Sequence, residues 1–173
     1  MTAETIRRLI RTLPGPLALL ILTPFVALSA QAQSDDGELD FKIDHVGISV
    51  ANLEESVNWY VEKLGFELTR PLNRNPEATM NIAAIRKGDF TIELFEIAGA
   101  APLPEYRRDP SADLRVHGLA HFAFQVDDAL AFQAELEAKG VEVVMRASED
   151  GRSNFFFVSD NSGNTFEFIQ RRR

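Results

Sequence analysis

The sequence predicts an α+β fold built from two tandem βαβββ modules, which are expected to pack together through their sheets. One pattern, a strand, a helix and three further strands, occurs twice with an offset of about 75 residues, which is the sign of an internal repeat. Hydrophobic residues make up 45% of the 173-residue chain, as in soluble globular proteins. That length suits one ordinary domain or two small modules sharing a core.

The first module is expected to span residues 41–98. It opens with FKIDHVGISV, which alternates as a strand does. Asn52 then fits a helix N-cap with Glu55 as its capping-box partner, and Gly65 stands where a helix usually ends. Three strand-like segments follow, FELTR, MNIAAIRK and FTIELFEI, with the turn residues Gly88 and Asp89 between the last two.

The second module is expected to span residues 118–170 in the same order. LAHFAFQV is its first strand, Asp127 or Asp128 the helix cap, and Gly140 the helix end. VEVVMR, SNFFFVS and TFEFIQ are its remaining strands. Residues 99–117 are rich in Pro, Ala and charge without a sustained period, and are expected to form a surface linker. PLNRNPEATM, in the first module, has no counterpart of equal length in the second, and such loops commonly shape a pocket.

Residues 1–32 have the layout of a secretory signal peptide. Three arginines precede an apolar run over residues 17–28, and Ala30-Gln31-Ala32 follows as a small-x-small cleavage site. We expect cleavage after Ala32, a flexible start over residues 33–40, and export to the periplasm. The alternative is a membrane anchor formed by the uncleaved segment. Since the apolar run is shorter than the roughly 20 residues of a spanning helix, no stable span is expected after cleavage.

Charge and composition exclude several classes of function. The net charge is −8, and no basic stripe is present to neutralise phosphates, so nucleic acid is not an expected partner. The basic tail, residues 171–173, is expected to be solvated. The absence of cysteine excludes thiol nucleophiles, thiolate metal sites and disulfides.

Strand parity places four polar side chains on one face of the predicted sheet. Side chains alternate between the faces of a strand, so residues two apart share a side. His45 and His121 hold equivalent positions in the first strands of the two modules, and Glu93 and Glu167 in the last strands. The neighbouring side chains on the opposite face are apolar, and that face is expected to carry the helices.

These four residues suggest a metal site. A single His or Glu in an apolar strand is ordinarily a hydrogen-bonded or solvent-facing group, but two carboxylates in the middle of a sheet are costly without a compensating cation. We therefore predict that one divalent ion is held by His45, Glu93, His121 and Glu167. Two imidazoles and two carboxylates suit Zn²⁺, Ni²⁺, Co²⁺, Mn²⁺ or Fe²⁺, and the sequence does not choose among them.

From Phe41 to Gln170 the chain resembles the vicinal-oxygen-chelate superfamily, also called the glyoxalase, bleomycin-resistance and dioxygenase family. The resemblance rests on four segments: IDHVGISVANLEESVNWYVEKLGFEL, IELFEI, GLAHFAFQVDD and FFFVSDNSGNTFEFIQ. In the last segment, Asn161 and Ser162 replace the Pro and Asp that are usual in the turn of the family. The resemblance implies the arrangement of the two modules, in which their strands form a curled mixed sheet of eight strands around a metal and substrate cleft. It also implies a small-molecule substrate and metal ligands at the four positions named above.

The ligand set resembles that of bacterial glyoxalase I, a lactoylglutathione lyase. This implies proton transfer next to a metal-bound carbonyl, with Glu167 as the base and Glu93 as a ligand or partner acid. Methylmalonyl-CoA epimerases usually carry Gln at the position of Glu93. Because glutathione is chiefly cytosolic, the expected export separates this chain from a glutathione-bound substrate.

Two other functions stay open. Extradiol dioxygenases of this fold match only His45, His121 and Glu167 and need open positions on iron, so the fourth ligand argues against that reading. The other alternative is a non-catalytic module that binds a small molecule, as resistance proteins of this fold do. Family members often form homodimers, and bacterial glyoxalase I combines one module from each chain in its site; either a site within one chain or a shared site is open here.

Several other polar residues are candidates for contact with a substrate. His117 is expected to belong to the linker rather than to the pocket. Four arginines could contact an anion, although surface charge is the favoured interpretation: Arg70, Arg74, Arg86 and Arg146.

Overall fold

The computed structural model describes residues 41–171 except 149, 151 and 153. The predicted signal peptide, residues 33–40 and the last two residues of the basic tail lie outside the described residues. Within the described part of the chain, no helix is both long enough and apolar enough to cross a membrane.

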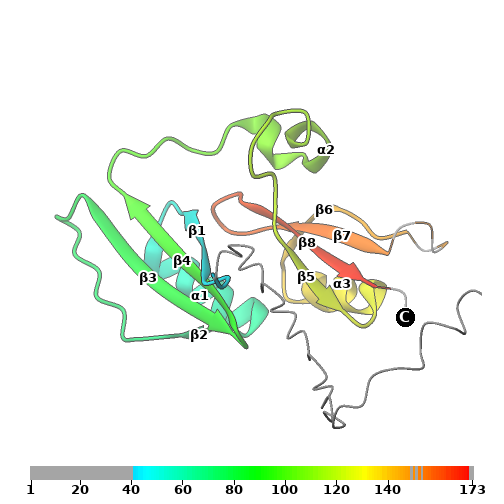
Figure 1. Cartoon of the computed structure of the whole chain (residues 1–173), viewed down its shortest axis with the longest axis horizontal. Helices are drawn as coiled ribbons and strands as arrows, with labels where there is room; N and C mark the ends of the chain where they lie inside the picture. The colour runs from blue at the N-terminus through cyan, green and yellow to red at the C-terminus, as the bar shows by residue number, and fades with distance from the viewer. Residues whose placement is uncertain (1–40, 149, 151, 153, 172–173) are drawn as a thin grey trace, which may run out of the picture. The chain divides into compact units, whose positions relative to one another are not determined.

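The first four strands and the first long helix form one βαβββ unit (Figure 1). Its strands are ordered β1-β4-β3-β2, with β1 parallel to β4 and the other pairs antiparallel. The helix α1 packs on β3 and β4 and buries Leu53, Val57, Tyr60 and Leu64. The elements are β1 (His45–Ser49), α1 (Leu53–Leu64), β2 (Glu67–Leu68), β3 (Met80–Lys87) and β4 (Phe90–Ile97).

The second unit repeats this topology. Its strands are ordered β5-β8-β7-β6, again with the first strand parallel to the last. Figure 1 shows α3 lying on one face of this sheet, where it contacts β6, β7 and β8. The elements are β5 (Ala123–Val126), α3 (Ala129–Ala138), β6 (Glu142–Met145), β7 (Phe155–Ser159) and β8 (Thr165–Gln170).

The predicted α+β class and the two βαβββ repeats are confirmed. The expected curled sheet of eight strands is, in this chain, two sheets of four strands. Within the described residues β1 pairs only with β4, and β5 only with β8, so no ladder joins the two sheets. Between them, the expected linker contains two short helical segments, η1 (Glu105–Arg108) and α2 (Pro110–Asp113).

The two long helices start and end where local chemistry dictates. The Asn52 side chain accepts a hydrogen bond from the Glu55 backbone N–H, and Gly65 adopts the left-handed conformation (φ 68°) that stops α1. Of the two cap candidates in the second module, Asp128 is the N-cap of α3, and Gly140 follows that helix with a φ of 76°.

The first strand of each sheet is shorter than the sequence pattern suggested. β1 begins at His45 rather than at Phe41, because its parallel partner β4 begins only at Phe90, after the turn at Gly88 and Asp89. The four residues before His45 therefore have no strand to pair with, and Ile43 is 90% exposed.

One core connects the two modules. The Tyr60 ring on α1 lies 6.2 Å from the Phe166 ring on β8, and Phe66 lies 6.0 Å from Phe124 on β5. The Tyr60 hydroxyl donates a 3.0 Å hydrogen bond to Asp160, in the turn before β8. Both side chains are buried, and burial is the main cause of the raised pKa of Tyr60. This hydrogen bond is one of several that hold α1 against the turn before β8, since the Ser56 hydroxyl also donates a 3.1 Å hydrogen bond to the Asn161 side chain.

Candidate metal and substrate site

The first half of the candidate site lies on the face of the first sheet opposite α1. Gly47 pairs with Glu93 in the parallel register of β1 and β4, and His45 pairs with Thr91, so the histidine lies two residue pairs before Glu93 on the same face of the sheet. The Nε2 atom of His45 lies 3.3 Å from Oε2 of Glu93. The flanking residues Ile92 and Leu94 are fully buried on the helix side, as strand parity requires.

The second half repeats this arrangement. The Nε2 atom of His121 lies 3.3 Å from Oε2 of Glu167, and Phe157 on β7 stands edge-on to the imidazole with the ring centroids 4.9 Å apart. The Glu167 side chain is 14% exposed, compared with 31% for Glu93. The pair in the second module is therefore the more enclosed of the two.

The donor chemistry of each pair fits a divalent ion. Two atoms that each lie about 2.1 Å from one ion are about 3.0 to 3.4 Å apart at octahedral or tetrahedral angles. A separation of 3.3 Å between imidazole nitrogen and carboxylate oxygen agrees with that spacing in both pairs. Among the described residues, however, no three metal-binding side chains gather at one place. The chain presents two matching half-sites.

Asp44 is a residue that the sequence analysis overlooked. Its Oδ2 atom lies 2.7 Å from Nδ1 of His45, so the carboxylate holds the imidazole from the side opposite Glu93. This hydrogen bond is the main reason why the pKa of His45 is raised, and the charge of Glu93 acts in the same direction. Carboxylates commonly orient metal-binding histidines in this way. The sequence feature that could have indicated this role is the position of Asp44 directly before His45.

A cavity of about 350 Å³ includes His121. Its walls come from the free edge of β1, from the extended segment that leads into β5, and from the linker. Arg107 on η1 reaches into it, which the sequence analysis did not foresee. The linker has no helical or strand periodicity from which its course could be predicted, so the sequence did not indicate that Arg107 would line the cavity.

None of the four arginines that were candidates for contact with an anion lines the cavity that includes His121. Arg74 forms a two-point ion pair with Glu96, at 2.6 and 2.8 Å, and Arg146 pairs with Glu137. Arg86 is exposed on β3, and Arg70 is exposed in the bend after β2. His117 is exposed in the linker and does not line the cavity that includes His121.

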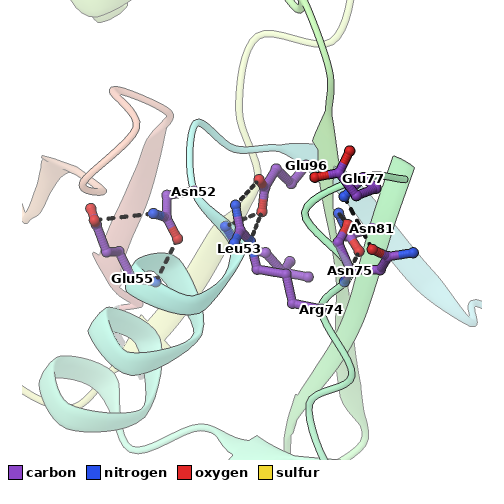
Figure 2. Close-up of polar contacts among 8 residues, drawn as sticks. All are labelled: Asn52, Leu53, Glu55, Arg74, Asn75, Glu77, Asn81 and Glu96. Atoms are coloured by element: carbon purple, nitrogen blue, oxygen red, sulfur yellow. Dashed lines mark hydrogen bonds and ion pairs between the residues drawn. The ribbon is translucent and has the colours of Figure 1, made fainter. Parts of the chain in front are cut away.

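The Arg74 pair instead fastens the long loop of the first module to α1, as Figure 2 shows. Glu96 also accepts a 3.0 Å hydrogen bond from the backbone N–H of Leu53, at the start of the helix. Beside it, Asn75 and Asn81 exchange two hydrogen bonds of 2.8 and 3.0 Å. The loop lines a separate cavity of about 380 Å³ that contains none of the predicted ligands.

Glu96 therefore carries a prediction for acid stability. The hydrogen bonds from Arg74 hold the pKa of Glu96 below its ordinary value of 4.5, at about 2. A lowered pKa stabilises the fold above the ordinary value, and this stabilisation is lost as the pH falls toward 2. At pH 7, Glu96→Gln should reduce the free energy of unfolding by about 2 kcal/mol. In urea unfolding curves, the difference from the wild type should shrink below pH 4.5.

Glu105→Gln is the matched control, because the Glu105 side chain is 91% exposed and lies 3.8 Å from its partner Arg108. It should change stability by less than about 0.5 kcal/mol at any pH. A Glu96→Gln variant as stable as this control at pH 7 would show that the ion pair does not anchor the loop.

Comparison with known proteins agrees with this geometry. Residues 42–168 match the sequence profile of the glyoxalase/bleomycin resistance protein/dioxygenase superfamily. A lactoylglutathione lyase of Neisseria meningitidis serogroup A is 30% identical over 131 residues, which cover 74% of this chain and 89% of the relative. The uncharacterized protein YwkD of Bacillus subtilis is 31% identical over 68% of this chain and 89% of its own length.

Solved structures agree as well. A glyoxalase family protein from Enterococcus faecalis superimposes with a TM-score of 0.59 at 29% identity, covering 74% of this chain and 96% of the other. The matched region holds both βαβββ repeats and all four predicted ligands. The chain belongs to the glyoxalase/bleomycin resistance protein/dioxygenase superfamily.

Proposed function

We propose that this protein is a metal-dependent, glyoxalase-like lyase or isomerase that moves a proton next to the carbonyl of a small molecule. The observation that carries the proposal is the duplicated His–Glu pair, with a nitrogen-to-oxygen distance of 3.3 Å in each module. Two imidazoles and two carboxylates leave positions open for a substrate on a divalent ion. His45, Glu93, His121 and Glu167 would hold this ion.

Each residue of the site would have a distinct role in the proton transfer. The bound ion would stabilise negative charge that develops on the carbonyl oxygen. Glu167 would take up the proton, because it lies beside Phe157 and is the more enclosed of the two carboxylates. Asp44 would keep His45 turned toward Glu93. Glu93 would serve as a ligand or as the partner acid.

We further propose that the complete site forms between two copies of the chain. Each copy supplies two half-sites, and no third donor joins either pair within the described residues. Large apolar side chains also line the open face beside the first pair. Met80 is 50% exposed and lies opposite Ile97, which is 44% exposed, on the same face as Glu93. A second copy would cover this surface while completing the ligand set.

A complementation experiment tests the shared site. One variant combines His45→Ala with Glu93→Ala, and a second combines His121→Ala with Glu167→Ala. Each alone should lose tight metal binding. In a statistical mixture, half of the dimers would contain one intact site, so about a quarter of the wild-type metal binding should return. Metal content after gel filtration measures this recovery. No recovery on mixing would place the site within one chain.

Metal identity and activity test the chemistry. Metal analysis of the purified protein distinguishes three outcomes. Nickel, cobalt or zinc in octahedral N/O ligation would support the proposal. Oxygen-sensitive ferrous iron would indicate a dioxygenase, and the absence of stoichiometric metal would indicate a binding module. Proton exchange in D₂O, followed by NMR, can be measured on three carbonyl compounds: the hemithioacetal of methylglyoxal and glutathione, hydroxyacetone and 2-oxobutyrate. Since we propose export to the periplasm, we expect activity on a compound without glutathione.

A further inference from the structure

The cavity that includes His121 is lined by one arginine side chain, that of Arg107. Arg107 is the only permanently charged side chain among its described lining residues, and no carboxylate lines it. Its other walls are largely apolar or backbone, including Leu103, Leu119 and the Gly47 region of β1. The carboxylate that pairs with Arg107, that of Asp113, lies outside the lining of this cavity, so the guanidinium is the charged group that a ligand in the cavity would meet.

Arg107 is held in place by two partners. Its Nε atom donates a 3.0 Å hydrogen bond to Asp113, whose side chain is only 6% exposed. Its Nη2 atom donates a 2.8 Å hydrogen bond to the carbonyl oxygen of Leu119, two residues before His121. Within the described residues no protein acceptor is recorded for Nη1, so this edge of the guanidinium keeps its donors for a ligand.

We propose that Arg107 is a specificity-determining residue that binds the carboxylate of the substrate, which makes the substrate an anionic 2-oxo acid or a close relative. This inference rests on the proposed function and specifies its substrate class. A guanidinium fixed by a buried carboxylate binds a second carboxylate through its remaining N–H groups at little cost in side-chain entropy. A cavity of about 350 Å³ is ample for such a small molecule.

The test compares two ligands of similar shape by calorimetry on the metal-loaded full chain. 2-Oxobutyrate carries the carboxylate, and 2,3-pentanedione carries a methyl group in place of one carboxylate oxygen. The wild type should bind 2-oxobutyrate at least about tenfold more tightly, as one charged hydrogen bond provides. Arg107→Gln should abolish this preference. Arg108→Gln is the matched control, since Arg108 is the next residue and does not line the cavity, and it should keep the preference.

A second variant changes the charge without removing the arginine. Asp113→Asn leaves Arg107 in place but removes the negative charge that competes with an anion, so the affinity for 2-oxobutyrate should rise severalfold. A purely structural role of the pair predicts weaker binding of both ligands in both variants. Equal affinity of the wild type for the two ligands, or an unchanged preference in Arg107→Gln, would overturn the inference. Failure of this inference would not affect the proposed metal site, because metal content and the complementation experiment test that site independently of Arg107.

Discussion

Replacing Glu167 with glutamine is expected to abolish proton exchange while leaving the fold intact. Glutamine has nearly the same shape but cannot accept the proton, and loss of a general base typically costs a factor of about 10² to 10⁴. The rate of C–H exchange in D₂O, on whichever of the three carbonyl compounds the wild type accepts, measures the effect. Thermal unfolding followed by circular dichroism verifies that the variant is folded.

Glu142→Gln provides the matched control, because Glu142 lies on β6 of the same sheet and is exposed. Its exchange rate should equal that of the wild type. If Glu167→Gln also kept the wild-type rate, another group would have to be the base, and Glu93 would become the first candidate.

Phe166→Ala is expected to cause the largest loss of stability. The Phe166 side chain is fully buried and stacks on Phe122 at 5.3 Å and on Tyr60 at 6.2 Å, so it belongs to the contact that joins the modules. Removing a buried phenylalanine costs about 3 to 5 kcal/mol through lost burial and the cavity left behind. Urea denaturation at pH 7 should show this decrease in the free energy of unfolding.

Phe155→Ala is the comparison on the neighbouring strand β7, where the side chain is only partly buried. It should cost about half as much or less, because solvent fills the space that it leaves. Similar losses in the two variants would mean that the aromatic contact between the modules is not a major source of stability.

The sequence predicted best what local chemistry determines. Asn52 and Gly65 mark the ends of α1, and β3, β4 and β8 have the bounds expected from their patterns. The lengths of the other five strands, β1, β2, β5, β6 and β7, were overestimated, because a strand extends only as far as its partner does. The separation into two sheets was not foreseen for the same reason: a period of two shows which face a side chain takes, not which edges pair.

In the candidate site too, the features set by local sequence were predicted, and those set by distant contacts were not. Parity predicted that His45 and Glu93 share one face of the sheet, as His121 and Glu167 do, and in the structure each pair lies on adjacent strands of one module. Whether the pairs meet depends on the contact between modules or chains, for which the sequence contains no periodic signal. Arg107 was missed because its position depends on the path of the linker, which is fixed by distant hydrogen bonds.

The hydrogen bond between Tyr60 and Asp160 spans 100 residues and has a consequence for the order of synthesis. A nascent chain that has only the first module already contains Tyr60, but neither its acceptor nor the ring of Phe166 against which it packs. That module alone would expose an aromatic surface and leave a hydroxyl without its partner. We therefore expect the first repeat to reach its final packing only when the last hairpin of the second repeat has been synthesised.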